Sequence, residues 1–237
     1  MTRLDKYVSE NLPCTRSEAK KLLASGKVTV DGIIVKNGEF KLDENSAEVV
    51  VNGKTLKRMS GLYYMLNKPA GCVSAVTDKE HKTVNDLFPE EIAKKIFPVG
   101  RLDLDTEGLL LMTDDGNFCH RLESPKKHVF KTYLAKCTGE LAEDAQKIFE
   151  EGIAFKDFTS KPAELELLYE KDGFIFVEVK ICEGRFHQVK RMLHHVGAEV
   201  LELKRTAIGG LKLDEKLMPG SYRELGKEER EMLFDHK

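Results

Sequence analysis

The sequence predicts an α+β protein of two parts, a small helix–hairpin domain followed by a larger domain with a largely antiparallel mixed sheet. The first ~55 residues contain two helix signals and one hairpin signal. The remainder has strand-like runs that a few helices interrupt, without the regular strand–helix alternation of a parallel sheet. A polar, basic stretch from Lys54 to Ser60 indicates a linker, so we place the domains at residues 1–58 and 61–237.

Two capping boxes predict the helices of the first part. Thr2 and Asp5 have the spacing of such a box, and so do Thr15 and Glu18, which make the better one. We expect the second helix to end at Gly26, because glycine commonly terminates helices.

A hairpin follows these helices. Two β-branched runs, residues 28–30 and 33–35, flank Asp31-Gly32, a dipeptide typical of tight hairpin turns. On the second helix Arg16 and Lys20 lie four residues apart and share one face.

Three segments carry a family resemblance: Arg3-Leu4-Asp5-Lys6, Thr15 to Leu23, and Gly26 to Gly32. The spacing alone fits an ordinary small domain with solvated lysines equally well. Together the segments resemble the S4 RNA-binding domain. The resemblance implies that the basic residues of this part contact RNA: Arg16, Lys20, Lys21 and Lys27.

The larger part, about 61–237, has seven element signals. The strand-like runs are 62–66, 109–112, 133–137 and 174–181, and the helix-like runs lie near 85–96, 141–151 and 185–196. No glycine-rich phosphate loop occurs, so we expect no nucleotide cofactor.

Composition excludes several classes of protein. No stretch approaches the ~20 apolar residues of a membrane helix, and the charged N-terminus has no signal-peptide core. The five cysteines lie far apart without a CxxC pair, which argues against zinc and disulfides and favours the cytoplasm. The net charge is −2, but residues 1–60 carry 11 Lys and Arg against 8 Asp and Glu, which favours a local contact with a polyanion.

The most distinctive segment is the loop from Gly100 to Gly108, which an apolar strand follows. Its acids Asp103, Asp105 and Glu107 imitate the start of a calcium-binding EF-hand loop. The flanking segments cannot form the two helices of an EF-hand, so we expect no metal here.

Gly-Arg-Leu-Asp at 100–103, followed by Thr-x-Gly-Leu-Leu-Leu at 106–111, resembles the signature of the pseudouridine synthases of the ribosomal small-subunit type. The resemblance implies that Asp103 is the essential carboxylate and that Arg101 lies against RNA near a flipped nucleotide. It also implies a catalytic role for Tyr133, in Lys131-Thr132-Tyr133, as the residue that stacks on the flipped base.

The segment Glu183 to Leu193 predicts a helix with Phe186, Val189, Leu193 and Val196 as its apolar stripe. The family resemblance points to Lys190 as the cation that keeps Asp103 ionised. The predicted RNA contacts of this segment are Arg185, His187 and Gln188. His187 and His194 lie seven residues apart, too far along a helix to share a metal ion.

The resemblance covers essentially the whole chain, since Leu66 to Gly71 and Leu203 to Gly210 also match family motifs. It implies an S4-like α/β domain, then a catalytic domain that isomerises uridine at position 516 of 16S rRNA. The expected partner is 16S rRNA or a small-subunit assembly intermediate, with no cofactor, no membrane and a monomeric enzyme. A synthase acting on 23S rRNA and a non-catalytic RNA-binding assembly factor are the alternatives.

Overall fold

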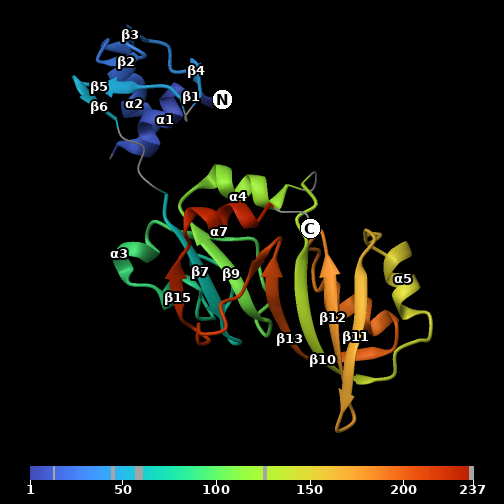
Figure 1. Cartoon of the computed structure of the whole chain (residues 1–237). Coiled ribbons are helices and arrows are strands. Elements are labelled where there is room, and N and C mark those ends of the chain that lie inside the picture. The colour runs from blue at the N-terminus through green and yellow to red at the C-terminus, as the bar shows by residue number, and fades with distance from the viewer. Residues whose placement is uncertain (13, 44–45, 57–60, 125–126, 235–237) are drawn as a thin grey trace. The chain divides into compact units, whose positions relative to one another are not determined.

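The chain forms two compact units, Met1–Ser60 and Gly61–Lys237 (Figure 1). The computed structural model describes all residues except 13, 44–45, 57–60, 125–126 and 235–237. One hydrophobic core lies within the first unit and two lie within the second.

The first unit combines two helices with short strands. Its elements are β1 (Thr2–Arg3), α1 (Leu4–Asn11), α2 (Arg16–Ala24), β2 (Val28–Val30), β3 (Ile33–Ile34), β4 (Lys41–Leu42), β5 (Val49–Val51) and β6 (Lys54–Thr55). The strand order of its larger sheet is β3-β2-β5-β6, and β1 pairs with β4. Leu4 and Val8 of α1 pack with Leu23 of α2 and Val28 of β2 in the core. The two helices and the hairpin expected for this unit are therefore present.

Local signals predicted most of this unit. The second capping box is present, because the Thr15 hydroxyl accepts from the Glu18 amide while the Glu18 carboxylate accepts from the Thr15 amide. The hairpin turn is also confirmed, with positive φ angles of 51° at Asp31 and 80° at Gly32.

Two details of the prediction are wrong. Thr2 lies in β1, so α1 begins after Arg3, which makes no side-chain cap, and the first capping box does not form. Lys54–Thr55 belongs to β6 and pairs with β5 instead of starting the linker. The rest of the predicted linker, at 57–60, lies outside the described residues.

Asp5 lies at the centre of an ion-pair cluster in this unit. Its carboxylate is fully buried and accepts hydrogen bonds from Arg3 Nη2 at 2.9 Å and Arg16 Nη2 at 3.2 Å. Lys20 Nζ lies 4.0 Å away. The hydrogen bond from Arg3 and the charge of Arg16 outweigh burial and lower the pKa of Asp5 from 3.8 to about 2.

This ion-pair cluster predicts an acid-sensitive first unit. Because the folded-state pKa of Asp5 is depressed, the carboxylate stabilises the fold above about pH 4, and this contribution is lost as the pH falls from 3.8 toward 2. We expect Asp5→Asn to reduce the protection of amides in α1 and α2 at pH 7. Hydrogen exchange, corrected for intrinsic rates, should show the wild type approaching the variant near pH 2; equal protection at both pH values would contradict the prediction.

The second unit is built on one mixed sheet. Its strands are β7 (Tyr63–Lys68), β8 (Phe97–Val99), β9 (Glu107–Thr113), β10 (Lys131–Gly139), β11 (Glu164–Lys171), β12 (Phe174–Ile181), β13 (Ala198–Ile208), β14 (Leu211–Lys212) and β15 (Tyr222–Glu224). The order is β11-β12-β10-β13-β9-β7-β15, with β14 beside β13 and β8 beside β9. Among the described strands β13 and β9 run parallel and the other pairs are antiparallel. The predicted fold class is therefore confirmed.

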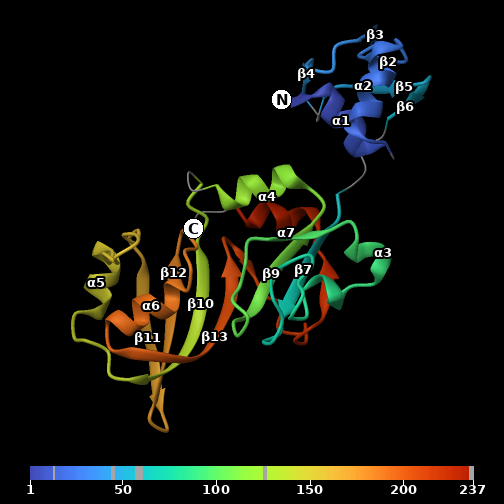
Figure 2. The ribbon, with the colours of Figure 1, turned by 180° about the vertical axis from the view of Figure 1, so that it is seen from behind.

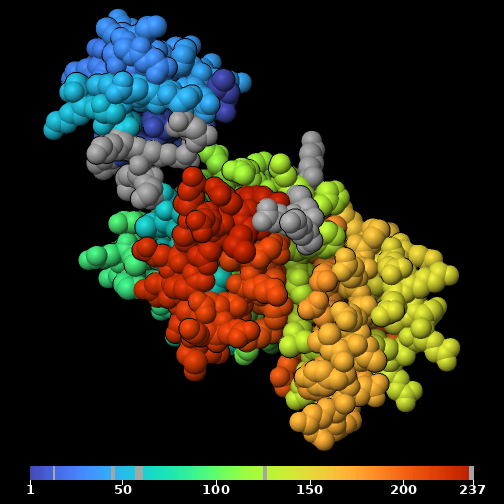
Figure 3. Space-filling view, viewed as in Figure 1, coloured from blue at the N-terminus to red at the C-terminus, as the bar shows by residue number. Residues whose placement is uncertain are grey.

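Helices cover both faces of this sheet. They are the 3₁₀ turn η1 (Asn85–Leu87) and the helices α3 (Glu90–Ala93), α4 (Gly116–Glu123), α5 (Ala145–Glu151), α6 (Gln188–His195) and α7 (Lys227–Met232). One core joins α5 and α6 to the sheet, on the face that Figure 2 shows in front. The other core joins α4 and the C-terminal segment to β7 and β9, and Figure 3 shows this segment in red over those strands.

All three helices predicted in this unit are shorter than expected, and the run near 185–196 is helical only from Gln188 to His195. The run near 85–96 is divided into η1 and α3 because Pro89, at the N-cap of α3, has an extended conformation with ψ at 143°. The run near 141–151 becomes helical only at Ala145.

Candidate active site

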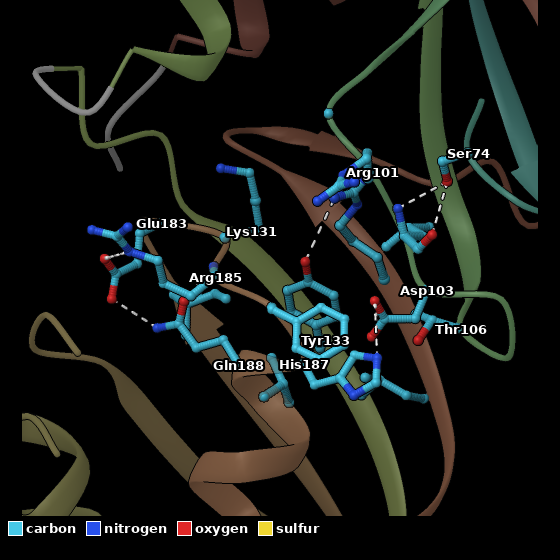
Figure 4. A pocket seen from close by; sticks show the side chains of 18 of the residues that line it. Ser74, Arg101, Asp103, Thr106, Lys131, Tyr133, Glu183, Arg185, His187 and Gln188 are labelled. Carbon is cyan, nitrogen blue, oxygen red and sulfur yellow. Dashed lines mark hydrogen bonds and ion pairs between the residues drawn. The ribbon is translucent and has the colours of Figure 1, made fainter. Parts of the chain in front are cut away.

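A pocket of about 790 Å³ lies where the two halves of the large sheet meet. One half is β11-β12-β10-β13 and the other is β9-β7-β15. This volume falls within the ~300–1,000 Å³ typical of small-molecule sites. Every site residue predicted in the second unit lines it: Arg101, Asp103, Tyr133, Arg185, His187, Gln188 and Lys190. Figure 4 shows Asp103, Tyr133 and His187 close together.

The loop between β8 and β9 holds Asp103 through its main chain. The buried Ser74 hydroxyl bonds to both the amide and the carbonyl of Leu102, each at 2.9 Å. The Gly71 amide donates to the Leu104 carbonyl at 2.8 Å. The residues on both sides of Asp103 are therefore fixed, while its carboxylate stays free to face the pocket.

Lys68 is the second support of this loop. Its side chain is fully buried, and Nζ donates to the carbonyls of Thr106 at 2.8 Å, Asp103 at 3.0 Å and Pro69 at 3.1 Å. Burial lowers the pKa of Lys68, and the charge interactions with the Cys72 thiol and with the acids of the loop oppose this effect. The lysine thus draws loop carbonyls around one ammonium group, which fixes the backbone that carries Asp103.

Among the described side chains, the imidazole of His187 is the one basic group within ion-pair distance of the Asp103 carboxylate. His187 Nε2 lies 3.7 Å from Asp103 Oδ1, an ion pair when the imidazole is protonated. Asp103 retains 30% of its side-chain exposure, so substrate can reach it. His187 has a left-handed backbone, with φ at 50°, and this turn directs its ring toward the loop.

Lys190 does not pair with Asp103, which corrects the prediction. Its Nζ lies 2.6 and 2.7 Å from the two carboxylate oxygens of Asp105. Asp105 is the more exposed acid, at 70%, and the hydrogen bond from Lys190 lowers its pKa. The loop and the start of α6 therefore align in two pairs, His187 with Asp103 and Lys190 with Asp105.

Tyr133 forms part of the pocket wall. It lies on β10 with 6% of its surface exposed, and its hydroxyl accepts a hydrogen bond from Arg205 Nη1 at 3.5 Å. Arg205 is almost completely buried, and its Nε donates to the Leu109 carbonyl at 2.7 Å. Its Nη2 has no hydrogen-bond partner among the described residues. A buried guanidinium therefore binds the Tyr133 hydroxyl and keeps one nitrogen without a partner among the described residues.

Gly108 explains how the two halves of the sheet approach each other. It pairs with Arg205 where β9 and β13 run parallel, and its φ is 102°. A Cβ at this position would lie 2.2 Å from the Arg205 carbonyl oxygen, closer than atoms can pack. Glycine at this position is therefore required for the parallel pairing of β9 and β13, the seam between the two halves of the sheet at which the pocket forms.

Basic side chains surround the pocket. Arg101 and Arg185 are exposed, and burial lowers the pKa of Lys131, which also lines the pocket. These cations can bind an anionic ligand without a bound metal. Within the residues that the structure describes, no group of three or more His, Cys, Asp or Glu side chains is placed to hold a metal ion.

Gln188, a predicted RNA contact, is buried and hydrogen-bonded within the loop before α6. It is 3% exposed, its amide nitrogen donates to Glu183 at 2.8 Å, and its oxygen accepts from the Arg185 amide. These bonds close the loop before α6 and leave little of the side chain available to a ligand.

Sequence reasoning missed three residues of the site: Ser74, Lys68 and Arg205. The motifs that contain Lys68 and Arg205 are conspicuous in the sequence, but no periodicity or spacing shows that these side chains are buried at the pocket. Ser74 has no signal of its own, because its importance depends on its two hydrogen bonds to Leu102.

Comparisons with known proteins agree with this geometry. A profile described as RNA pseudouridylate synthase matches residues 62–195, and an S4 domain profile matches residues 2–47. The chain is 45% identical to ribosomal small subunit pseudouridine synthase A of Salmonella typhimurium, covering 96% of this chain and 97% of the relative. It is 41% identical to an uncharacterized RNA pseudouridine synthase of Bacillus subtilis, covering 98% of both chains. A crystal structure of a pseudouridylate synthase superposes with a TM-score of 0.70 and 40% identity, covering 98% of this chain and 100% of the other.

Proposed function

Because this chain belongs to the RNA pseudouridylate synthase family, we propose that it converts one uridine of small-subunit ribosomal RNA to pseudouridine, at position 516 of 16S rRNA. The chain is a pseudouridine synthase, an isomerase. The observation that carries the choice of RNA is the 45% identity, over 96% of the chain, to a protein named for the ribosomal small subunit.

The reaction rearranges one nucleotide. The N1–C1′ bond of uridine breaks, the base turns, and a C5–C1′ bond forms, while the proton lost from C5 is balanced by one gained at N1. No atom or electron is imported, so we propose that no cofactor takes part. The target must leave the base stack and enter the pocket, which costs a few kcal/mol that the basic rim offsets.

We assign the chemistry to three side chains that the fold brings together. Asp103 acts at the sugar, as a nucleophile on C1′ or as a base at C2′. Tyr133 stacks on the flipped uracil and accepts a proton. His187, in the place expected for Lys190, lies beside the Asp103 carboxylate and orients it, while Lys190 pairs with Asp105 on the same loop.

The two units divide the work in this proposal. Residues 1–58 bind RNA through Arg16, Lys20, Lys21 and Lys27, and residues 61–237 carry out the chemistry. The described part of the chain contains no helix long and apolar enough to cross a membrane. We propose a monomer that acts in the cytoplasm on 16S rRNA or an assembling small subunit.

Mapping pseudouridine in the rRNA of cells that lack this protein tests the proposal. We expect one site to be lost, at position 516 of 16S rRNA, and restored by the wild-type gene but not by the Asp103→Asn variant. Loss of a site in 23S rRNA would move the target to the large subunit. A complete set of pseudouridines would favour the non-catalytic assembly factor.

The basic face of α2 gives a prediction about binding. Arg16 and Lys20 are 52% and 59% exposed, and we propose that both contact phosphates. Arg16→Ala combined with Lys20→Ala should weaken RNA binding and reduce the slope of log Kd against log salt by roughly 1.4–1.8, since each phosphate contact adds ~0.7–0.9. Kd measured at several salt concentrations checks this.

A matched pair of lysines provides the control. Lys41 and Lys54 lie on β4 and β6, and their double alanine variant should keep the wild-type slope. Arg3 still pairs with Asp5 in the Arg16/Lys20 variant, so the buried carboxylate keeps a partner. An unchanged slope in that variant would mean that this face does not contact RNA.

A further inference from the structure

Phe186 is an exposed aromatic residue at the pocket. The periodicity of its segment predicts a buried position in the apolar stripe of α6, but 69% of its surface is exposed. The rest of the stripe is buried: Val189, Leu193 and Val196 are 4% exposed or less. The left-handed backbone of His187 separates Phe186 from the helix and turns it out of the core.

The exposed ring is ordered by a stacking contact. The rings of Phe186 and His187 lie nearly parallel, with centroids 3.8 Å apart and an interplanar angle of 18°. This distance is close to the ~3.4 Å that separates consecutive bases in a stack. With 69% of the residue exposed, the face of Phe186 away from His187 is open to a third planar group.

The stacked rings of His187 and Phe186 lie next to Asp103, the carboxylate assigned to the reaction. His187 lies 3.7 Å from the Asp103 carboxylate, and Phe186 is one aromatic layer further out. Tyr133, deep in the wall with 6% exposure, is the aromatic residue that an inserted uracil would meet. Phe186 and Asp103 line the same pocket, so a nucleotide next to a target held at Asp103 lies within reach of the outer ring.

The surroundings of Phe186 favour nucleic acid over an apolar partner. Arg185, next to it in the chain, is 62% exposed, and Arg101 lies on the same pocket. Exposed aromatic rings interleaved with cations are the usual platform for unstacked bases, since the ring accepts the base and the cations accept the backbone.

We propose that Phe186, supported by His187, is a subsite that stacks on the base directly before or after the target uridine and holds it when the target flips. This inference rests on the proposed function. The subsite replaces the stacking that the neighbour loses when the target leaves the helix, so it lowers the cost of flipping. Phe186 is a substrate-positioning residue in this proposal.

The test combines protein variants with RNA that lacks one base. The probe is a 16S rRNA fragment centred on position 516, intact or with an abasic ribose at the preceding, the target or the following position. Phe186→Ala should raise the Kd for intact RNA by roughly 5- to 100-fold, the range for loss of one base–aromatic stack. The same variant should bind RNA that is abasic at one of the two neighbouring positions as well as the wild type does, within about 2-fold.

Two further variants separate stacking from general effects. Phe186→Trp keeps an aromatic face and should restore the Kd for intact RNA to within about 3-fold of the wild type. Tyr169 on β11 is the matched control, because it is 51% exposed and stacks on Phe176 with centroids 4.5 Å apart, yet does not line the pocket. Tyr169→Ala should leave every Kd unchanged.

Three results would overturn the inference. They are an unchanged Kd for Phe186→Ala, an equal penalty on all four RNAs, and a penalty that disappears only when the target base itself is absent. Pseudouridine formation by the wild type on the intact fragment is measured in parallel. Absence of product contradicts the proposed function, whereas product without the coupling to a neighbouring base contradicts this inference alone.

Discussion

Replacing Asp103 with asparagine is expected to lower kcat for pseudouridine formation by on the order of 10⁴-fold or more, because the amide can neither attack C1′ nor take a proton at C2′. The substitution keeps the size of the side chain, and the loop is held by hydrogen bonds between its main chain and the side chains of Lys68 and Ser74. RNA binding should therefore stay within about 3-fold of the wild type. Single-turnover product formation and a separate Kd measurement check both parts.

Asp105→Asn is the matched control, two residues along the same loop. Asp105 is 70% exposed, and its pair with Lys190 is worth about 0–1 kcal/mol at such a surface site. We expect its kcat to fall by no more than about 5-fold. Wild-type rates from purified Asp103→Asn, or an equal loss in both variants, would remove Asp103 from its catalytic role.

Lys68→Met should produce the second large effect, on stability and activity together. Methionine fills similar space but cannot donate, so the carbonyls of Thr106, Asp103 and Pro69 lose their shared donor. We expect the free energy of unfolding to fall by about 2–4 kcal/mol. Because the loop then shifts, kcat should fall by roughly 10²-fold while KM changes less.

Denaturant unfolding and steady-state kinetics measure the two effects. Lys94→Met makes the same chemical change at a lysine that is 71% exposed and paired with Glu90 on α3. That control should stay within about 0.5 kcal/mol of the wild type. If Lys68→Met is as stable and as active as Lys94→Met, the ammonium does not hold the loop.

Features that depend on residues close together in the sequence could be predicted. The capping box of Thr15 and Glu18 and the turn at Asp31-Gly32 need only a few residues each, so their chemistry determines the local backbone. The alternation of β12 likewise reflects one face against the core, with Ile175 and Val177 buried. The loop of Asp103 was recognisable because its motif is contiguous.

Pairings between distant segments could not be predicted in the same way. Asp103 and Asp105 are equivalent partners for Lys190 in the sequence, and the choice depends on how α6 lies against the loop. The exposure of Phe186 depends on a single left-handed residue that helical periodicity does not reveal. The burial of Lys68 depends on carbonyl groups more than thirty residues further along the chain. Tertiary structure decides each of these outcomes.

The parallel seam between β9 and β13 has a consequence for how activity arises during folding. Asp103 lies on the loop before β9, on one side of this seam. Tyr133 lies on β10 and His187 directly precedes α6, and both belong to the half of the sheet that contains β13. Contacts between such distant segments close long loops and form slowly. On the proposed assignment, a chain in which one half has folded holds only part of the set Asp103, Tyr133 and His187, so we expect it to be inactive toward RNA until both halves have joined.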